Sequence, residues 1–77
     1  METSLFNLPV GKKAIVIRLE GGLRLQRKLA TLNIRVGKTI KKVTLQPFSG
    51  PVVIEVDTRK IALGRGMTLK IFVEEQK

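Results

Sequence analysis

Cysteine and histidine are both absent from this chain of 77 residues. Without cysteine the fold cannot depend on disulfide bonds, and this favours a cytoplasmic location, because small secreted domains are usually held together by them. Without histidine the chain lacks the commonest general base, and without either residue it lacks the commonest transition-metal ligands. A serine nucleophile would have no histidine to activate it. We therefore expect no catalytic site, no cofactor and no metal site.

Long apolar runs are missing too. The longest uninterrupted apolar stretch, residues 14–17, is far shorter than the roughly 20 residues of a membrane-spanning helix. Residues 1–11 include Glu2, Asn7 and Pro9 and have neither the basic nor the apolar region of a signal peptide. We expect a cytoplasmic protein that does not insert into a membrane.

Acidic residues are scarce: 6 aspartates and glutamates stand against 15 lysines and arginines, for a formal net charge of +9. No acidic residue lies between Gly21 and Ile54. We expect this acid-free stretch to create a positive field that attracts an acidic partner. Its basic residues are Arg24, Arg27, Lys28, Arg35, Lys38, Lys41 and Lys42.

Tryptophan and tyrosine are also absent, and the three phenylalanines are scattered along the chain. Proteins that bind single-stranded nucleic acid usually stack the bases on aromatic side chains, and this sequence offers no such platform. A weakly specific mode that contacts only phosphates stays open, because it needs charge alone. Nucleic acid is therefore the alternative partner for this basic chain.

Four short segments show the two-residue alternation of half-buried β-strands. The second, residues 38–45, keeps this alternation only if a β-bulge lies near residues 41–42. A further short strand is expected over residues 58–63 and a tight turn at residues 64–66, while prolines and a glycine mark residues 46–51 as a loop. The side chains expected on the buried faces of the other three segments are Ile15, Ile17, Leu19, Val52, Ile54, Val56, Leu69, Ile71 and Val73.

One segment has the period of an amphipathic helix. Leucines at i, i+4 and i+7, from Leu25 to Leu32, line one side of it. The glycines at residues 21–22 mark its start, and Asn33 tolerates the left-handed conformation that commonly ends a helix. We expect this helix over residues 23–32, between the first two strands.

Short strands and a single short helix in a chain of this size predict a small closed barrel, because closure removes exposed sheet edges. We expect a mainly β, SH3-like barrel of about five strands, as one domain over residues 1–77. Leu23 would be left exposed at the start of the helix. The residues expected to be buried together are Ile15, Ile17, Leu25, Leu29, Val52, Ile54, Leu69 and Ile71.

Several short motifs, in this order and without gaps, resemble those of the FeoA family almost end to end. They are Leu-Pro-Val-Gly at residues 8–11, the arginine- and leucine-rich run at residues 27–37, and the strands at residues 50–56, 61–63 and 71–73. Residues that depart from the family's usual ones are Asn33, Thr58, Gly64 and Thr68.

The resemblance implies an SH3-like barrel with an inserted helix and a non-enzymatic accessory role in ferrous-iron uptake. It implies contact with the cytosolic G-protein part of the large FeoB-type transporter, which would bring the protein to the inner face of the membrane. The same fold occurs in metal-dependent transcriptional repressors, so metal-linked regulation is a related alternative. Family members are often classed as transition-metal binders, but this sequence offers no soft ligand, and we expect no metal site.

The polar face of the expected helix is the predicted partner-binding surface. Its cations would meet an acidic surface on the transporter, with Leu23 as an apolar contact at the edge. The residues assigned to this surface are Leu23, Arg24, Arg27, Lys28, Arg35, Lys41 and Lys42.

Overall fold

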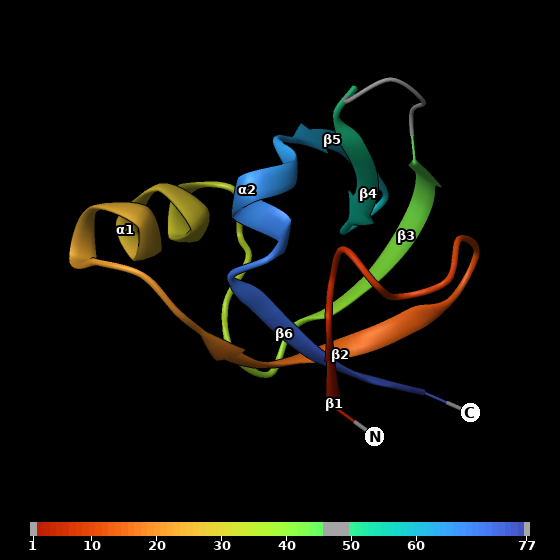
Figure 1. Ribbon diagram of the computed structural model, residues 1–77, viewed down its shortest axis with the longest axis horizontal. Helices are drawn as coiled ribbons and strands as arrows, with labels where there is room; N and C mark the ends of the chain where they lie inside the picture. Colours follow the sequence, from red (N-terminus) through yellow and green to blue (C-terminus); the bar gives the residue numbers. More distant parts are fainter. Residues whose placement is uncertain (1, 46–49, 77) are drawn as a thin grey trace.

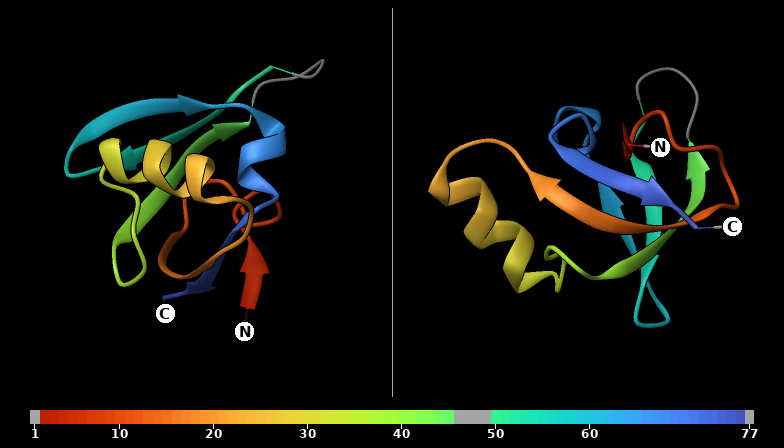
Figure 2. Two further views of the ribbon diagram at one scale, coloured as in Figure 1. Left: turned by 90° about the vertical axis from the view of Figure 1, so that its left-hand side faces the viewer. Right: turned by 90° about the horizontal axis from the view of Figure 1, so that it is seen from below.

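The computed structural model describes residues 2–45 and 50–76 (Figure 1). In chain order the elements are β1 (Glu2–Ser4), β2 (Lys13–Leu19), α1 (Leu23–Thr31), β3 (Thr39–Leu45), β4 (Val52–Val56), β5 (Arg59–Leu63), α2 (Arg65–Thr68) and β6 (Ile71–Glu75). All strands belong to one antiparallel sheet in the order β1-β6-β2-β3-β4-β5. The sheet twists around a central core, and α1 stands to one side of it (Figures 1 and 2). This confirms the mainly β, SH3-like architecture with α1 between the first two long strands.

The barrel differs from the prediction at its edges. Residues 2–4 form β1, which pairs with β6, so the sheet formed by the described residues has six strands where about five were expected. In the described part of the chain β1 and β5 each pair with one neighbour, so hydrogen bonds do not close the barrel between them. The sequence of β1, Glu-Thr-Ser, has too little apolar character to predict a strand.

The core is built from one face of the sheet and one face of α1. In β4 the alternation is as predicted, with Val52, Ile54 and Val56 fully buried. Ile71 and Val73 of β6 are buried as predicted. The other buried apolar residues are Leu5, Leu8, Ala14, Val16, Leu29, Ile34, Ile40 and Leu63.

The predicted buried face of β2 is wrong for Ile15 and Ile17, whereas Leu19 packs against the core opposite Ile71, because the register with β6 shifts between Val16 and Arg18. Ala14 and Val16 are fully buried, whereas Ile15 and Ile17 are half-buried on the opposite face. Both faces of this strand are apolar, so alternation alone does not decide which one turns inward. Pairing with β6 decides it, because Val16 lies opposite the buried Val73.

The segment before β6 also differs from the prediction. Residues 64–66 were expected to form a tight turn, but Arg65–Thr68 is the short helix α2. Leu69 caps this helix and is exposed, so its predicted place in the core is wrong. Residues 46–49 of the predicted loop lie outside the described residues, while Gly50 and Pro51 are irregular as expected.

Candidate partner-binding site

Helix α1 is preceded by a glycine that the local geometry requires. Gly21 has φ +103°, a conformation that side chains of L-residues rarely adopt. A Cβ atom at this position would also lie 2.7 Å from Cδ2 of Leu25. Gly22 is the N-cap and provides no side-chain hydrogen bond, and the first turn contains no acidic residue. The positive end of the helix dipole therefore has no acidic side chain on α1 to offset it.

The end of α1 follows the prediction. Asn33 has φ +65°, and its N–H donates to the carbonyl oxygen of Ala30 at 2.9 Å. The N–H of Ile34 donates to the carbonyl oxygen of Leu29, also at 2.9 Å. This pair of hydrogen bonds is a Schellman motif, and the buried Ile34 adds the apolar contact that usually accompanies one.

Three leucines set the orientation of α1. Leu29 is fully buried, and Leu25 and Leu32 are partly buried against the core. The opposite side of the helix therefore faces solvent. It presents exposed Leu23 with Arg24, Arg27 and Lys28, which are all exposed. The structure thus brings four of the predicted site residues together on one helix.

Asp57, in the turn between β4 and β5, ties the end of α1 to the sheet. Its carboxylate accepts a hydrogen bond from the side-chain amide of Asn33 and pairs with Lys38 Nζ at 2.6 Å. The hydrogen bond from Lys38, and then that from Asn33, lower the pKa of Asp57 below its usual value. The charged form of Asp57 therefore helps to hold the end of α1 in place.

This tie predicts a pH dependence of stability. Because the pKa of Asp57 is lower in the folded than in the unfolded chain, its contribution is complete above the unfolded value of about 3.9 and is lost as the pH falls through the folded value. Asp57→Asn should therefore flatten the loss of unfolding free energy below about pH 4, as measured by urea titrations at a series of pH values. Lys38→Met removes the main cause of the lowered pKa of Asp57 and should flatten this loss of unfolding free energy similarly. If unfolding free energy fell with pH as steeply in Asp57→Asn as in the unmodified protein, this role of Asp57 would be contradicted.

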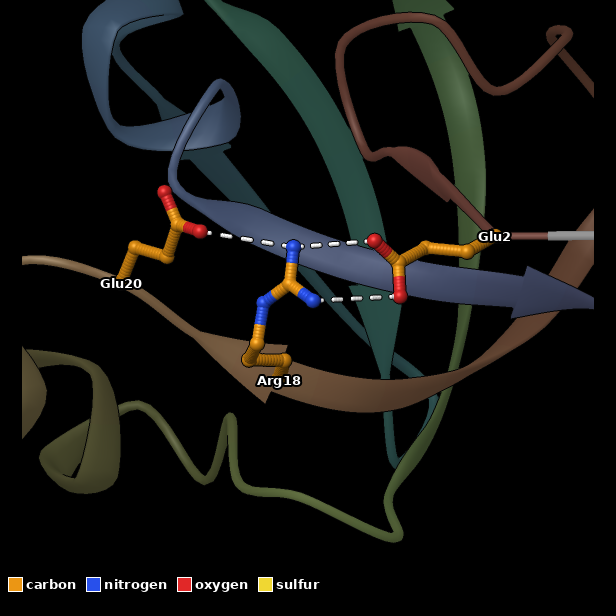
Figure 3. Close-up of polar contacts among 3 residues, drawn as sticks. All are labelled: Glu2, Arg18 and Glu20. Carbon is orange, nitrogen blue, oxygen red and sulfur yellow. Dashed lines mark hydrogen bonds and ion pairs between the residues drawn. The ribbon is translucent and has the colours of Figure 1, made fainter.

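The acidic residues are largely engaged with cations away from α1. Arg18 forms a bidentate pair with Glu2, at 2.9 and 3.3 Å, and its guanidinium also lies 3.3 Å from Glu20 (Figure 3). The same guanidinium stacks on Phe72, 4.3 Å from the ring centroid. These contacts join β1 to β2 across β6 and take up two carboxylates. Within residues 2–45 and 50–76, no ion pair involves the cations of α1.

Two further predicted site residues lie outside α1. Arg35 is exposed in the turn between α1 and β3. Lys41 is half-buried in β3, where it lies opposite Lys13 of β2 on one side and Glu55 of β4 on the other. Arg35 can therefore extend the helix surface, whereas Lys41 belongs to the sheet.

The assignment of Lys42 to the surface is wrong. Its side chain is buried, and Nζ donates a 2.5 Å hydrogen bond to the carbonyl oxygen of Phe6. Burial lowers its pKa, and the nearby charge of Arg65 lowers it further. The register of β3 shifts between Lys42 and Thr44, after the predicted place, so Lys42 keeps the inward direction of Ile40. A partner at the surface cannot reach it.

Some exposed apolar residues were missed. Leu69 is 51% exposed, Val36 62% and Val10 54%, compared with 63% for the predicted Leu23. Lys70 beside Leu69 lies close to the start of α1, because the N–H of Glu20 donates to its carbonyl oxygen at 2.8 Å. No local pattern in the sequence indicates this proximity, which comes from the pairing of β2 with β6.

Residues 2–45 and 50–76 contain no helix that is long and apolar enough to cross a membrane. In the same residues, no group of three or more aspartates and glutamates is placed to hold a metal ion.

Comparison with known proteins gives consistent matches. The model of a family described as the FeoA domain matches residues 3–75. A protein of Methanocaldococcus jannaschii named Fe(2+) transport protein A is 34% identical over 65 residues, which are 84% of this chain and 77% of that protein. A crystal structure of an iron uptake regulatory protein (FeoA) has a TM-score of 0.91 and 29% identity, covering 99% of this chain and all of the other. A manganese-dependent transcriptional repressor, 18% identical, has a TM-score of 0.89 over 97% of this chain and 42% of its own, which shows a shared fold alone.

Proposed function

The chain belongs to the FeoA family of ferrous-iron transport accessory proteins, and on that premise we propose that it acts without catalysis, by docking on the cytosolic G-protein part of a FeoB-type transporter. The protein would then work in the cytoplasm, at the inner face of the membrane. Absence of histidine and cysteine supports the non-enzymatic part of the proposal, because the usual nucleophile and general-base pairs are missing.

The observation that carries the proposal is the exposed face of α1. It combines an apolar side chain, Leu23, with the cations Arg24, Arg27 and Lys28, and the helix contains no acid. A buried aliphatic contact surrounded by charges is a common arrangement at protein interfaces. The complementary partner is an acidic surface with a small apolar depression. Arg35 extends the basic surface beyond the end of the helix.

A triple variant that reverses three charges on α1 tests the electrostatic part of the proposal. It carries Arg24→Glu, Arg27→Glu and Lys28→Glu. We expect association with the transporter's cytosolic domain to slow by about 10-fold or more at low salt, because charges at an interface rim mainly speed encounter. The difference from the unmodified protein should shrink as salt rises. Leu23→Ala should leave the association rate nearly unchanged and speed dissociation. Surface plasmon resonance at two salt concentrations measures both rates.

A matched control carries the same charge change elsewhere. Lys13→Glu, Arg59→Glu and Lys60→Glu replace exposed cations on β2 and β5. This variant should bind the transporter domain faster than the α1 variant. Equal rates for the two variants would show diffuse attraction and no docking on α1. If the unmodified protein instead bound generic DNA or RNA tightly at physiological salt, the nucleic-acid alternative would replace the proposal.

A further inference from the structure

A second basic surface lies on the outer face of the sheet, apart from α1. Strand pairing places Lys13 of β2 opposite Lys41 of β3, Lys41 opposite Glu55 of β4, and Glu55 opposite Lys60 of β5. Three lysines and one glutamate thus form a single row across four strands. The transporter-docking proposal does not use this row.

Lys13 and Lys41 face each other directly on neighbouring strands. Backbone hydrogen bonds join positions 12 and 42 (Lys42 N to Lys12 O, 3.1 Å) and positions 16 and 38 (Val16 N to Lys38 O, 2.9 Å). Because hydrogen-bonded and non-hydrogen-bonded pairs alternate along an antiparallel ladder, the Lys13–Lys41 pair is of the non-hydrogen-bonded type, in which side chains are closer. Like charges directly opposite one another destabilise a sheet. Glu55, opposite Lys41 on β4, carries a single negative charge and cannot neutralise both ammonium groups.

These two lysines line a shallow pocket of about 160 Å³. Thr39 adds a hydroxyl group to the lining, and Glu55 and Asp57 contribute carboxylates. The carboxylate of Asp57 is already engaged by Asn33 and Lys38. In the described part of the chain no ion pair involves Lys13 or Lys41, so the pocket has two ammonium groups available to an anion.

We propose that this pocket binds a small phosphate-bearing anion through Lys13 and Lys41, with Thr39 as a hydroxyl donor. A phosphate group carries enough negative charge to relieve the repulsion between the two lysines, and it has several oxygens for three donors. The pocket is shallow and open to water, so binding is weak and depends on salt. A pocket of about 160 Å³ has room for a phosphate or pyrophosphate group, so we assign it to a free phosphorylated small molecule.

Titration of the ¹⁵N-labelled protein with inorganic pyrophosphate at constant ionic strength tests the site. We expect saturable NMR shifts centred on Lys13, Thr39 and Lys41. Lys13→Ala and Lys41→Ala should each weaken binding by about two- to fivefold, and the double variant by about 10-fold. Pyrophosphate should raise the melting temperature of the unmodified protein and not that of the double variant, which also checks that the variant folds.

The control is the pair Arg24→Ala and Lys28→Ala, which removes the same charge from α1 and should leave pyrophosphate binding unchanged. Equal weakening in this control would overturn the proposal, because it would mean that pyrophosphate binds by net charge alone. Equal affinity for citrate would overturn the preference for phosphate. Affinity that rises steadily with the length of an oligonucleotide would show that the row is part of a nucleic-acid surface instead.

Discussion

Leu29→Ala should lower the free energy of unfolding by about 2–5 kcal/mol. Leu29 is the fully buried residue of α1 and packs into the sheet core. Truncating it removes apolar burial and leaves a cavity that its neighbours fill only in part. The loss is a large share of the total stability of a domain of this size, which is of the order of 4–12 kcal/mol. Urea denaturation followed by circular dichroism measures it.

Leu23→Ala is the matched control, because it makes the same chemical change on the same helix. Leu23 is 63% exposed and Leu29 is fully buried, so the control should change stability by no more than about 0.5 kcal/mol. If both substitutions lowered stability equally, α1 would be packed differently from the structure. Amide hydrogen exchange adds a second readout, since Leu29→Ala should speed exchange in α1 more than in β4.

Gly21→Ala should destabilise the protein by about 1–2 kcal/mol. The backbone φ of +103° is strained for any L-residue, and no side-chain movement relieves that strain. The added Cβ atom would also meet Cδ2 of Leu25 at 2.7 Å, but this contact involves the end of a flexible side chain and can relax. We therefore attribute most of the expected loss to the backbone. Thermal and urea unfolding measure it.

Gly22→Ala provides the comparison for this position. Gly22 has φ −76°, and an added Cβ atom would meet nothing within 4 Å. Because alanine is a poorer N-cap than glycine, Gly22→Ala should cost about 0.5–1 kcal/mol, less than Gly21→Ala. Neither glycine variant changes the charge of α1, so transporter binding that weakens only in Gly21→Ala would show that the position of the helix matters as well as its charge. A larger loss of stability in Gly22→Ala than in Gly21→Ala would contradict the backbone geometry before α1.

Patterns within one segment were enough to predict α1 and the faces of β4 and β6. The leucine spacing identified the buried side of α1, and Asn33 marked its end, because both depend on residues a few positions apart. Leu23, Arg24, Arg27 and Lys28 follow from the same spacing, since whatever is opposite the leucines must face solvent. In β4 and β6 one face is clearly more apolar than the other, so alternation decided which face is buried.

The tertiary structure decided what depends on pairing between distant segments. The register of β2 with β6 determines which face of β2 turns inward. Residues 2–4 form the strand β1 because they pair with β6. Lys42 is buried because β3 shifts register after it, a difference of about one residue that composition does not indicate. Lys13 and Lys41 are neighbours because β2 pairs with β3 in the register that places them opposite each other. In a β-sheet each side chain is placed by its partner strand, and a one-residue change in register turns it to the opposite face.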